Sequence, residues 1–154
     1  MSAPEHRPSI ASALCYKDPK AALKWLESAF GFEPFMVILG PDDSLVHSEM
    51  RFGDGIVMIG SEWSPKHKSP ANLDGLNTQT VHVQLKTDVD AHCARARKAG
   101  AKIAMEPTNQ FYGDRSYRAV DLEGHIWSFA QTIKQMTPEE WDAAMPGIKT
   151  KTRL

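Results

Sequence analysis

The chain has 154 residues, which is enough for one compact domain with a real core and too few for two ordinary ones. Hydrophobic residues make up 42% and charged residues 24%, a globular mixture that argues against extensive disorder. The formal net charge of −1 leaves no basic surplus, which argues against nucleic acid as a partner.

Three further absences narrow the class of protein. No apolar run reaches the length of a membrane span, so we expect no membrane association. The first residues lack the basic start and apolar stretch of a signal peptide. The two cysteines, Cys15 and Cys93, lie outside any CxxC pair and form no disulfide framework, so we expect a reduced cytoplasmic protein.

The first half of the chain predicts one strand, one helix and three more strands. Residues 9–16 are short and mostly apolar, as in a strand. Asp18 and Pro19 suit the cap and first position of a helix, which Gly31 would end. The three further strands are predicted over residues 34–39, 45–52 and 56–60.

The second half repeats this order. A strand is predicted over residues 80–86, followed by a helix from Asp88 to about residue 99 that Gly100 ends. The last three strands are predicted over residues 102–105, 116–121 and 125–130, with a loop over 107–113. Asp18 and Asp88 are 70 residues apart, so the repeat is one of pattern at a fixed offset. We therefore expect a single α+β domain of two β-α-β-β-β modules, module one over residues 8–60 and module two over 78–131.

Two segments lie outside the modules. Residues 61–77 are rich in Pro, Ser and Asn and form a linker, which either packs over the sheet or acts as a flap whose Trp63 faces a ligand. Residues 132–154 contain Thr137 and Glu140 at the spacing of a capping box, which predicts a short helix to about Met145 and then a loose basic tail.

Paired modules of this order resemble the vicinal oxygen chelate superfamily, which includes glyoxalases, bleomycin-resistance proteins and extradiol dioxygenases. The segment FGDGIVMIG at 52–60 is similar to the end of that family's first module, and DVDAHCARARKAGAKI at 88–103 is similar to its second helix. The segment YGDRSYRAVDLEGHIWSF at 112–129 is similar to the final hairpin of the resistance-protein-like branch. The resemblance implies curved mixed sheets around a cavity, with modules that often pair across a homodimer.

In metal-dependent members of that family, His, Gln or Glu side chains on the first and last strands of each module hold a divalent ion. Carried over, the four positions fall near Ala11, Ile59, His82 (or Val81, by a different count) and Ser128. Only His82 is a metal-ligand type, so we expect no metal and no other cofactor. If a displaced metal site exists, His82 and Glu49 are its candidates, with His47 and Glu62 nearby.

One charged face stands out in module one. His47, Glu49 and Arg51 alternate along a predicted strand and therefore share a face. They form either a solvent-facing charged ladder or a group inside the cavity. In the second case, His47 and Glu49 could act as a catalytic acid–base pair.

The segment 111–131 carries the remaining candidates. Tyr112 and Arg115 belong either to a loop tied by an Asp114–Arg115 or backbone bond, or to a cavity mouth where the guanidinium receives an anionic or carbonyl group. His125 is expected to bond to backbone, and Trp127 to line the core or the cavity wall. The candidate ligand-binding residues are Trp63, His82, Tyr112, Arg115 and Trp127.

The resemblance favours a glyoxalase/bleomycin-resistance-like protein with an aromatic-lined cavity for a small organic ligand, without the family's metal site. The alternative is an enzyme of the same superfamily, a lyase, isomerase or dioxygenase that uses a metal or the His47–Glu49 pair. A structural or regulatory dimer with no ligand is a third class.

Overall fold

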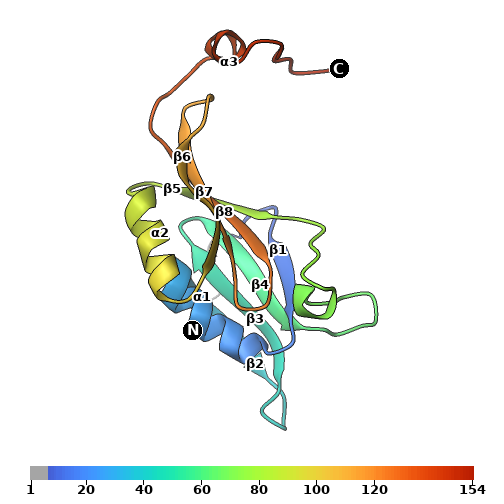
Figure 1. Cartoon of the computed structure of the whole chain (residues 1–154). Helices are drawn as coiled ribbons and strands as arrows, with labels where there is room; N and C mark the ends of the chain where they lie inside the picture. Colours follow the sequence, from blue (N-terminus) through green and yellow to red (C-terminus); the bar gives the residue numbers. More distant parts are fainter. Residues whose placement is uncertain (1–6) are drawn as a thin grey trace.

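A computed structural model describes residues 7–154, and its elements follow the predicted order (Figure 1). Module one comprises β1 (Ser12–Tyr16), α1 (Pro19–Phe30), β2 (Glu33–Leu39), β3 (Leu45–Phe52) and β4 (Gly55–Ser61). Module two comprises β5 (Val81–Leu85), α2 (Val89–Lys98), β6 (Lys102–Asn109), β7 (Asp114–Val120) and β8 (Ile126–Thr132). A 3-10 turn, η1 (Pro70–Asn72), lies in the linker, and α3 (Pro138–Ala144) follows module two.

Each module forms a four-stranded mixed sheet with the same topology. The strand orders are β1-β4-β3-β2 and β5-β8-β7-β6, and the first strand of each module runs parallel to its last strand. The predicted α+β class of two repeated modules is confirmed.

Most strand boundaries differ from the prediction by a few residues, and two of the differences concern residues discussed above. β6 continues to Asn109 where a loop was expected to start at residue 107, and β8 begins at Ile126, which leaves His125 in the turn. Pro107 is tolerated because β6 lies at the edge of its sheet, where a missing N–H breaks no ladder bond on the outer side, and β6 also carries register shifts there.

The helices start and stop for the expected local reasons. Asp18 caps α1 by accepting a hydrogen bond from the Ala21 N–H, and Gly31 ends it in the left-handed conformation at φ 76°. Asp88 caps α2 in the same way through the Ala91 N–H. Each helix places an apolar stripe against its own sheet, and the two helices lie next to each other on one side of the molecule (Figure 1).

A single hydrophobic core joins the two modules. Its members come from both helices and from the helix-facing sides of both sheets. The largest fully buried side chains are Trp127, Tyr16, Tyr117, Phe30, Phe32 and Phe129. Phe30 at the end of α1 has ring contacts with Trp127 and Phe129 of β8, so the aromatic residues of the two modules interlock.

The β7–β8 turn fastens module two to the start of module one. The buried Asp121 carboxylate accepts hydrogen bonds from the Tyr16 hydroxyl at 2.6 Å and the Trp127 indole N–H at 3.0 Å. Glu123 accepts from the backbone N–H groups of Lys17 and Asp18, directly before α1, where negative charge also suits the helix dipole. We call this set of contacts the turn clamp.

His125 belongs to the same clamp. Its Nε2 lies 2.8 Å from the Cys15 carbonyl oxygen, and since a carbonyl only accepts, Nε2 carries the proton. The expected backbone-bonding role of His125 is therefore what the structure shows.

A second set of contacts joins the two helices. Arg95 of α2 donates to the carbonyl oxygens of Glu27 and Ser28 at the C-terminal end of α1, where a cation is favourable. His92 donates from Nε2 to the Phe30 carbonyl at 2.8 Å and accepts at Nδ1 from the Tyr117 hydroxyl at 2.6 Å. His92 thus links the last carbonyl of α1 to the middle of β7.

The C-terminal segment leaves the body of the molecule at the β6–β7 turn. A side chain at Gly113 would lie 2.1 Å from the Lys134 carbonyl oxygen, so only glycine lets the two segments cross. Beyond the crossing, α3 stands apart from the sheets in Figure 1, with none of its side chains buried. The predicted capping box of Thr137 and Glu140 is present.

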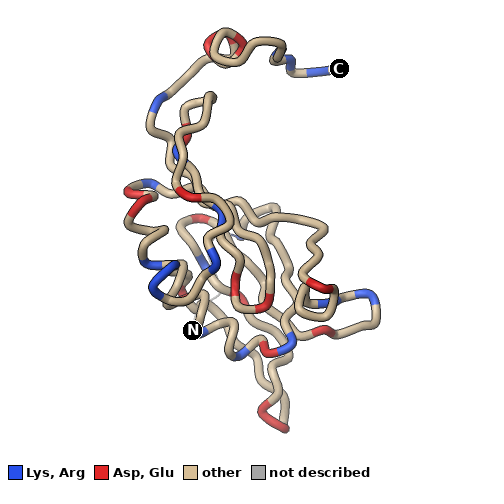
Figure 2. Tube along the Cα trace, in the orientation of Figure 1, with Lys and Arg blue, Asp and Glu red and all other residues tan. Residues whose placement is uncertain are grey.

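The charges are mixed along the chain. Figure 2 shows Lys and Arg interspersed with Asp and Glu over both modules. Within residues 7–154, no helix is both long enough and apolar enough to cross a membrane.

The turn clamp predicts strong coupling between Tyr16 and Asp121. Asp121→Asn removes a buried charge that two side-chain donors share, and should lower the free energy of unfolding by about 2–4 kcal/mol; Tyr16→Phe should cost about 1.5–3 kcal/mol. In a double-mutant cycle by urea denaturation, the coupling should be about 1–3 kcal/mol. Asp74→Asn, at an exposed position, is the control. Strictly additive effects of the two clamp substitutions would contradict the assignment.

The helix contacts predict a pH dependence of stability. Burial lowers the pKa of His92 below its ordinary value of 6.5, and the hydrogen bond to the Phe30 carbonyl only partly offsets this. Because the unfolded chain then binds a proton more readily than the folded chain, the contribution of His92 is complete above about pH 6.5 and is lost as the pH falls towards the folded pKa. The His92→Gln variant keeps one donor and one acceptor but does not titrate in this range. Its melting temperature should therefore fall less than that of the unchanged protein between about pH 7 and pH 5. An equally steep fall in both proteins would show that His92 does not carry the effect.

Candidate functional site

Each sheet has one face covered by its helix and one face without a helix, which we call the open face. Strand register identifies the residues on it, because neighbours across a sheet share a face. Across module one the open face carries a row of Ala13, Met58, Glu49 and Met36. Across module two the equivalent row is His82, Ser128, Arg118 and Met105.

The two rows match strand for strand. Each row runs through the first, fourth, third and second strand of its module and ends on a methionine. The third-strand positions carry opposite charges, Glu49 on β3 and Arg118 on β7. The repeat seen in the sequence therefore produces two matching rows with opposite charges at the third-strand position.

His47 and Glu49 meet on the open face of module one. His47 Nε2 lies 3.1 Å from Glu49 Oε1, and Arg7 donates to the same oxygen at 2.5 Å. The side chain of Glu49 is only 3% exposed, so the expectation of a solvent-facing charged ladder is wrong for this residue. Burial raises the pKa of Glu49, but the hydrogen bonds from Arg7 and His47 outweigh burial and shift its pKa downward overall.

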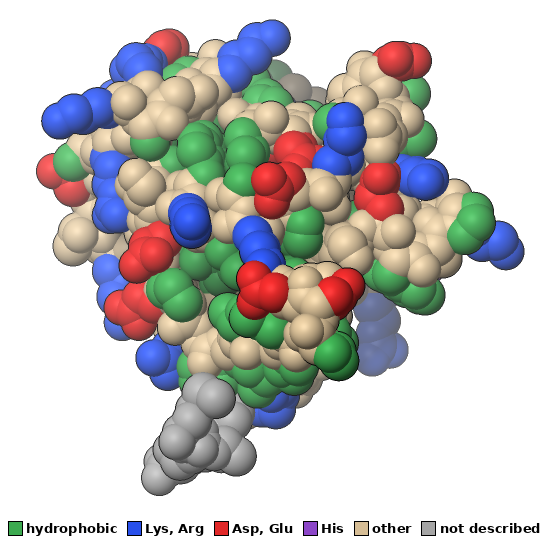
Figure 3. Space-filling view, turned by 90° about the horizontal axis from the view of Figure 1, so that it is seen from below, with side chains coloured by type: hydrophobic (Ala, Val, Ile, Leu, Met, Phe, Trp, Pro, Cys, Tyr) green, Lys and Arg blue, Asp and Glu red, His purple; other side chains and the backbone are tan. Residues whose placement is uncertain are grey.

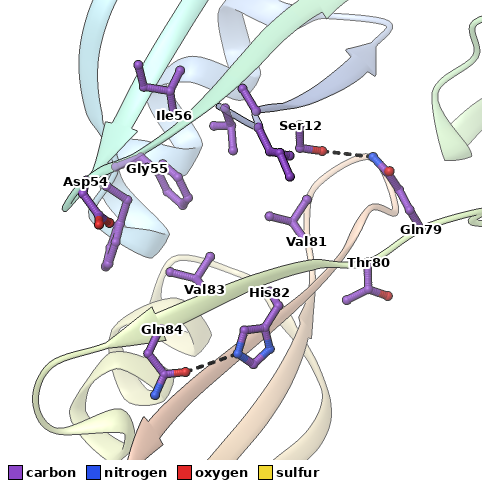
Figure 4. Close-up of a pocket in the computed structure, with 15 residues that line it drawn as sticks. Ser12, Asp54, Gly55, Ile56, Gln79, Thr80, Val81, His82, Val83 and Gln84 are labelled. Atoms are coloured by element: carbon purple, nitrogen blue, oxygen red, sulfur yellow. Dashed lines mark hydrogen bonds between the residues drawn. The ribbon is translucent and has the colours of Figure 1, made fainter. Parts of the chain in front are cut away.

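A cleft of about 480 Å³ opens where the first strands of the two modules approach each other (Figure 4). We call it the first-strand cleft. Its apolar wall includes Phe52, Ile56 and Val81, and its polar groups come mainly from β5 and the residues before it. The Gln79 side chain donates to the Ser12 hydroxyl at 3.0 Å across the top of the cleft.

His82 lies at the first-strand cleft and on the open face of module two. Its Nε2 is 3.3 Å from Gln84 Oε1, as Figure 4 shows, and Gln84 donates onward to Thr132. Val81 instead packs against the hydrophobic core. Of the two positions that the family comparison left open, His82 is the one that faces outwards.

The residues on the open faces do not fit the family's metal site. Ile59 is fully buried towards the helix, and its neighbours along β4, Met58 and Gly60, take the opposite side of the strand. The row that crosses the first and last strands of the two modules consists of Ala13, Met58, His82 and Ser128, a set with one imidazole and no carboxylate. Within residues 7–154, no group of three or more His, Cys, Asp or Glu side chains is arranged to hold a metal ion. Glu62 is engaged by the Ser69 N–H and the Asn72 side chain.

Two predicted ligand contacts are corrected by the structure. Trp127 has no exposed surface and donates to Asp121, so it is a core residue of the turn clamp. Arg115 forms a bidentate ion pair with Asp90 of α2, in which Nη2 lies 2.8 Å from Oδ1 and Nε lies 2.9 Å from Oδ2. It also donates to the Asn109 side chain. Its guanidinium therefore ties β7 to the helix side of the sheet, and the bond expected with Asp114 is replaced by one with Asp90.

The two remaining aromatic candidates lie away from the first-strand cleft. Tyr112 is 39% exposed at the β6–β7 turn, where its carbonyl accepts a hydrogen bond from Trp141. Trp63 is 70% exposed and stacks on His67 with ring centroids 3.8 Å apart. The linker is held by Ser69, which donates to Glu123 of the turn clamp, while Trp63 itself stays on the surface.

The sequence reasoning missed the partners that surround Glu49. Alternation along β3 placed Glu49 and His47 on one face, but the approach of Arg7, Met36 and Met58 depends on how separate strands align. Arg118 was missed for the same reason.

Comparison with known proteins agrees with this architecture. The family model of the Glyoxalase/Bleomycin resistance protein/Dioxygenase superfamily matches residues 9–129, and the chain belongs to this superfamily.

Relatives with similar sequences include uncharacterised proteins of Mycobacterium bovis and Mycobacterium tuberculosis. Each is 31% identical over 142 residues, which cover 90% of this chain and 92% or 82% of theirs. Among solved structures, TioX from Micromonospora sp. ML1 is 33% identical with a TM-score of 0.66, and the match covers 80% of this chain and 97% of TioX. TnmS3, an antibiotic binding protein from Streptomyces sp. CB03234, shares the fold at 18% identity, with a TM-score of 0.62 and coverage of 86% and 99%.

Proposed function

We propose that this protein binds a small organic ligand, without a metal ion, between the open faces of its modules in a homodimer, and that the two modules act as one binding domain. The observation that carries this proposal is the first-strand cleft, which reaches the open face of module two at His82. Its lining combines apolar walls with a few polar groups, which is the usual composition of a small-molecule site.

The wall residues indicate how the ligand would be held. Phe52, Ile56 and Val81 offer apolar contact, while His82 and Gln84 offer hydrogen bonds at one side of the cleft. His47 and Glu49 lie on the open face of module one, outside the lining of this cleft. One fold neighbour, TnmS3, is described as an antibiotic binding protein, which shows that this architecture can serve such a role.

Exposed apolar side chains support the homodimer. Val37, Ile38 and Leu39 of β2 and Val46 of β3 are each between 45% and 63% exposed. Figure 3, seen from the end that carries the β2–β3 turn, shows hydrophobic surface between patches of both charges. A second copy would bury this surface. Both cysteines are free, which is compatible with the cytoplasm.

The rival proposal is an enzyme, and one observation favours it. The 3.1 Å contact between His47 and Glu49 is the geometry of an acid–base pair. Turnover of a ligand that His47→Gln abolishes while ligand binding persists would establish this rival.

The metal-free part of the proposal predicts a negative result in elemental analysis. Protein purified gently and without a tag should contain well below one transition-metal ion per chain, and chelator should leave its melting temperature unchanged. About one ion per chain, together with a melting temperature that chelator lowers, would contradict the proposal and direct attention to His82 and Glu49.

The ligand-binding part predicts saturable protection by aromatic and peptide-like compounds, read as a rise in melting temperature. Ser12→Trp, at a half-buried position whose side chain points across the first-strand cleft towards Gln79, should weaken protection by about tenfold or more, since ligand and indole compete for the same volume. Glu139→Trp on α3 is the control, because that helix buries no side chain. Equal protection of both variants would show that the ligand binds elsewhere.

A further inference from the structure

Glu49 presents a buried oxygen that the fold itself does not use. Both hydrogen bonds to its carboxylate, from Arg7 and His47, end on Oε1. Oε2 is buried, and among the side chains of residues 7–154 it is the one buried polar atom without a hydrogen-bond partner. Leaving such an oxygen unpaired is costly, so the site favours any group that brings a donor to it.

The surroundings of Glu49 define what kind of donor fits. Met58 of β4 and Met36 of β2 are its neighbours across the sheet, one on each side, and both are only partly buried. Thioethers are polarizable and adapt to flat apolar groups. Glu49 therefore lies between two soft apolar side chains on the open face of module one.

Arg7 shows how a cation contacts the Glu49 carboxylate. Its guanidinium reaches Glu49 Oε1 from the segment before β1, while its side chain is 46% exposed. An exposed side chain such as that of Arg7 is easily displaced. Its displacement would free both oxygens of the Glu49 carboxylate for a planar, bidentate donor.

We propose that Glu49 is the recognition point for a planar cationic group, an amidinium or guanidinium carried on an apolar body, and that Arg7 occupies this point when no ligand is bound. This inference rests on the proposed ligand-binding function and assigns the chemical class of the ligand. The carboxylate selects the charge, and Met36 and Met58 hold the adjoining apolar surface.

The competing occupant is a second copy of the chain. Arg118 takes the same place in the row of module two that Glu49 takes in module one. An exposed arginine could reach Glu49 of another copy, in which case Glu49 would serve assembly and leave no free oxygen for a ligand. The test must separate these two occupants.

Benzamidine and benzamide are the matched probes. They have nearly the same shape, but only benzamidine carries a two-pronged cation at neutral pH. Binding is followed by NMR of methionine methyl groups, in which Met36 and Met58 report on the surroundings of Glu49. Met50, fully buried on the opposite face of β3, is the internal control. Benzamidine should shift Met36 and Met58 at about millimolar concentrations, as expected for a fragment, with an affinity at least about tenfold above that of benzamide.

Four variants locate the selectivity. Glu49→Gln keeps the shape and removes the charge, so the preference for benzamidine should disappear; Glu33→Gln, on an exposed carboxylate of β2, should leave it unchanged. Arg7→Ala removes the intramolecular occupant and should strengthen benzamidine binding severalfold. Arg51→Ala removes the same charge from the strand face that carries Glu49, and it should leave benzamidine binding unchanged.

Each result decides between the possibilities. Equal binding of both probes, or a preference that survives in Glu49→Gln, overturns the Glu49 assignment while leaving the proposed function in place if aromatic ligands still protect the protein. If Glu49→Gln and Arg118→Gln each convert a dimer into monomers in sedimentation velocity, the second copy is the occupant and the ligand assignment fails. Because Arg7→Ala does not alter Glu49, it keeps the test decisive even if Glu49→Gln fails to fold. Absence of binding by any aromatic probe would contradict the proposed function as well.

Discussion

The buried carboxylate of Asp121 is the constraint on which this architecture depends. One oxygen accepts from Tyr16 and Trp127, and the other accepts from the backbone N–H groups of Glu123 and His125. A buried charge is tolerated only when hydrogen bonds replace its hydration, and here four donors do so. Since Tyr16 opens module one and Asp121 closes the last hairpin of module two, the carboxylate fixes how the modules meet. Both helices then fall on the same side and share one core.

That arrangement leaves the opposite faces of both sheets free. The largest aromatic residues lie in the core, and the rows described on the open faces carry polar side chains with methionines at matching positions. The duplicated topology gives two matching rows, which carry opposite charges, Glu49 and Arg118, at the third-strand position. At the positions to which the family resemblance carries the metal ligands, the open faces present alanine, methionine, histidine and serine. We propose that recognition here relies on apolar contact and a buried carboxylate.

Much of the fold was predictable because it is encoded locally. Apolar spacing, the caps at Asp18 and Asp88 and the closing Gly31 predicted both helices, and alternation placed His47 and Glu49 on one face. The site was less predictable, since it depends on alignment between strands that are distant in sequence. Arg115 reads equally well as a ligand contact or a structural tie until Asp90 is seen beside it. Alternation along β8 does not tell whether the side of the strand that carries Trp127 faces the core or a cavity. Only the packing of the two modules shows that Trp127 lies in the core.

Native mass spectrometry of the untagged protein, purified gently from its expression host, tests the central claim most directly, since it reports chain number, metal content and bound small molecules together. The account predicts two chains per particle without a metal ion, and an added mass of a small organic compound once a binding compound is supplied. A particle that retains about one metal ion per chain, or a single chain that takes up no organic compound, would contradict it.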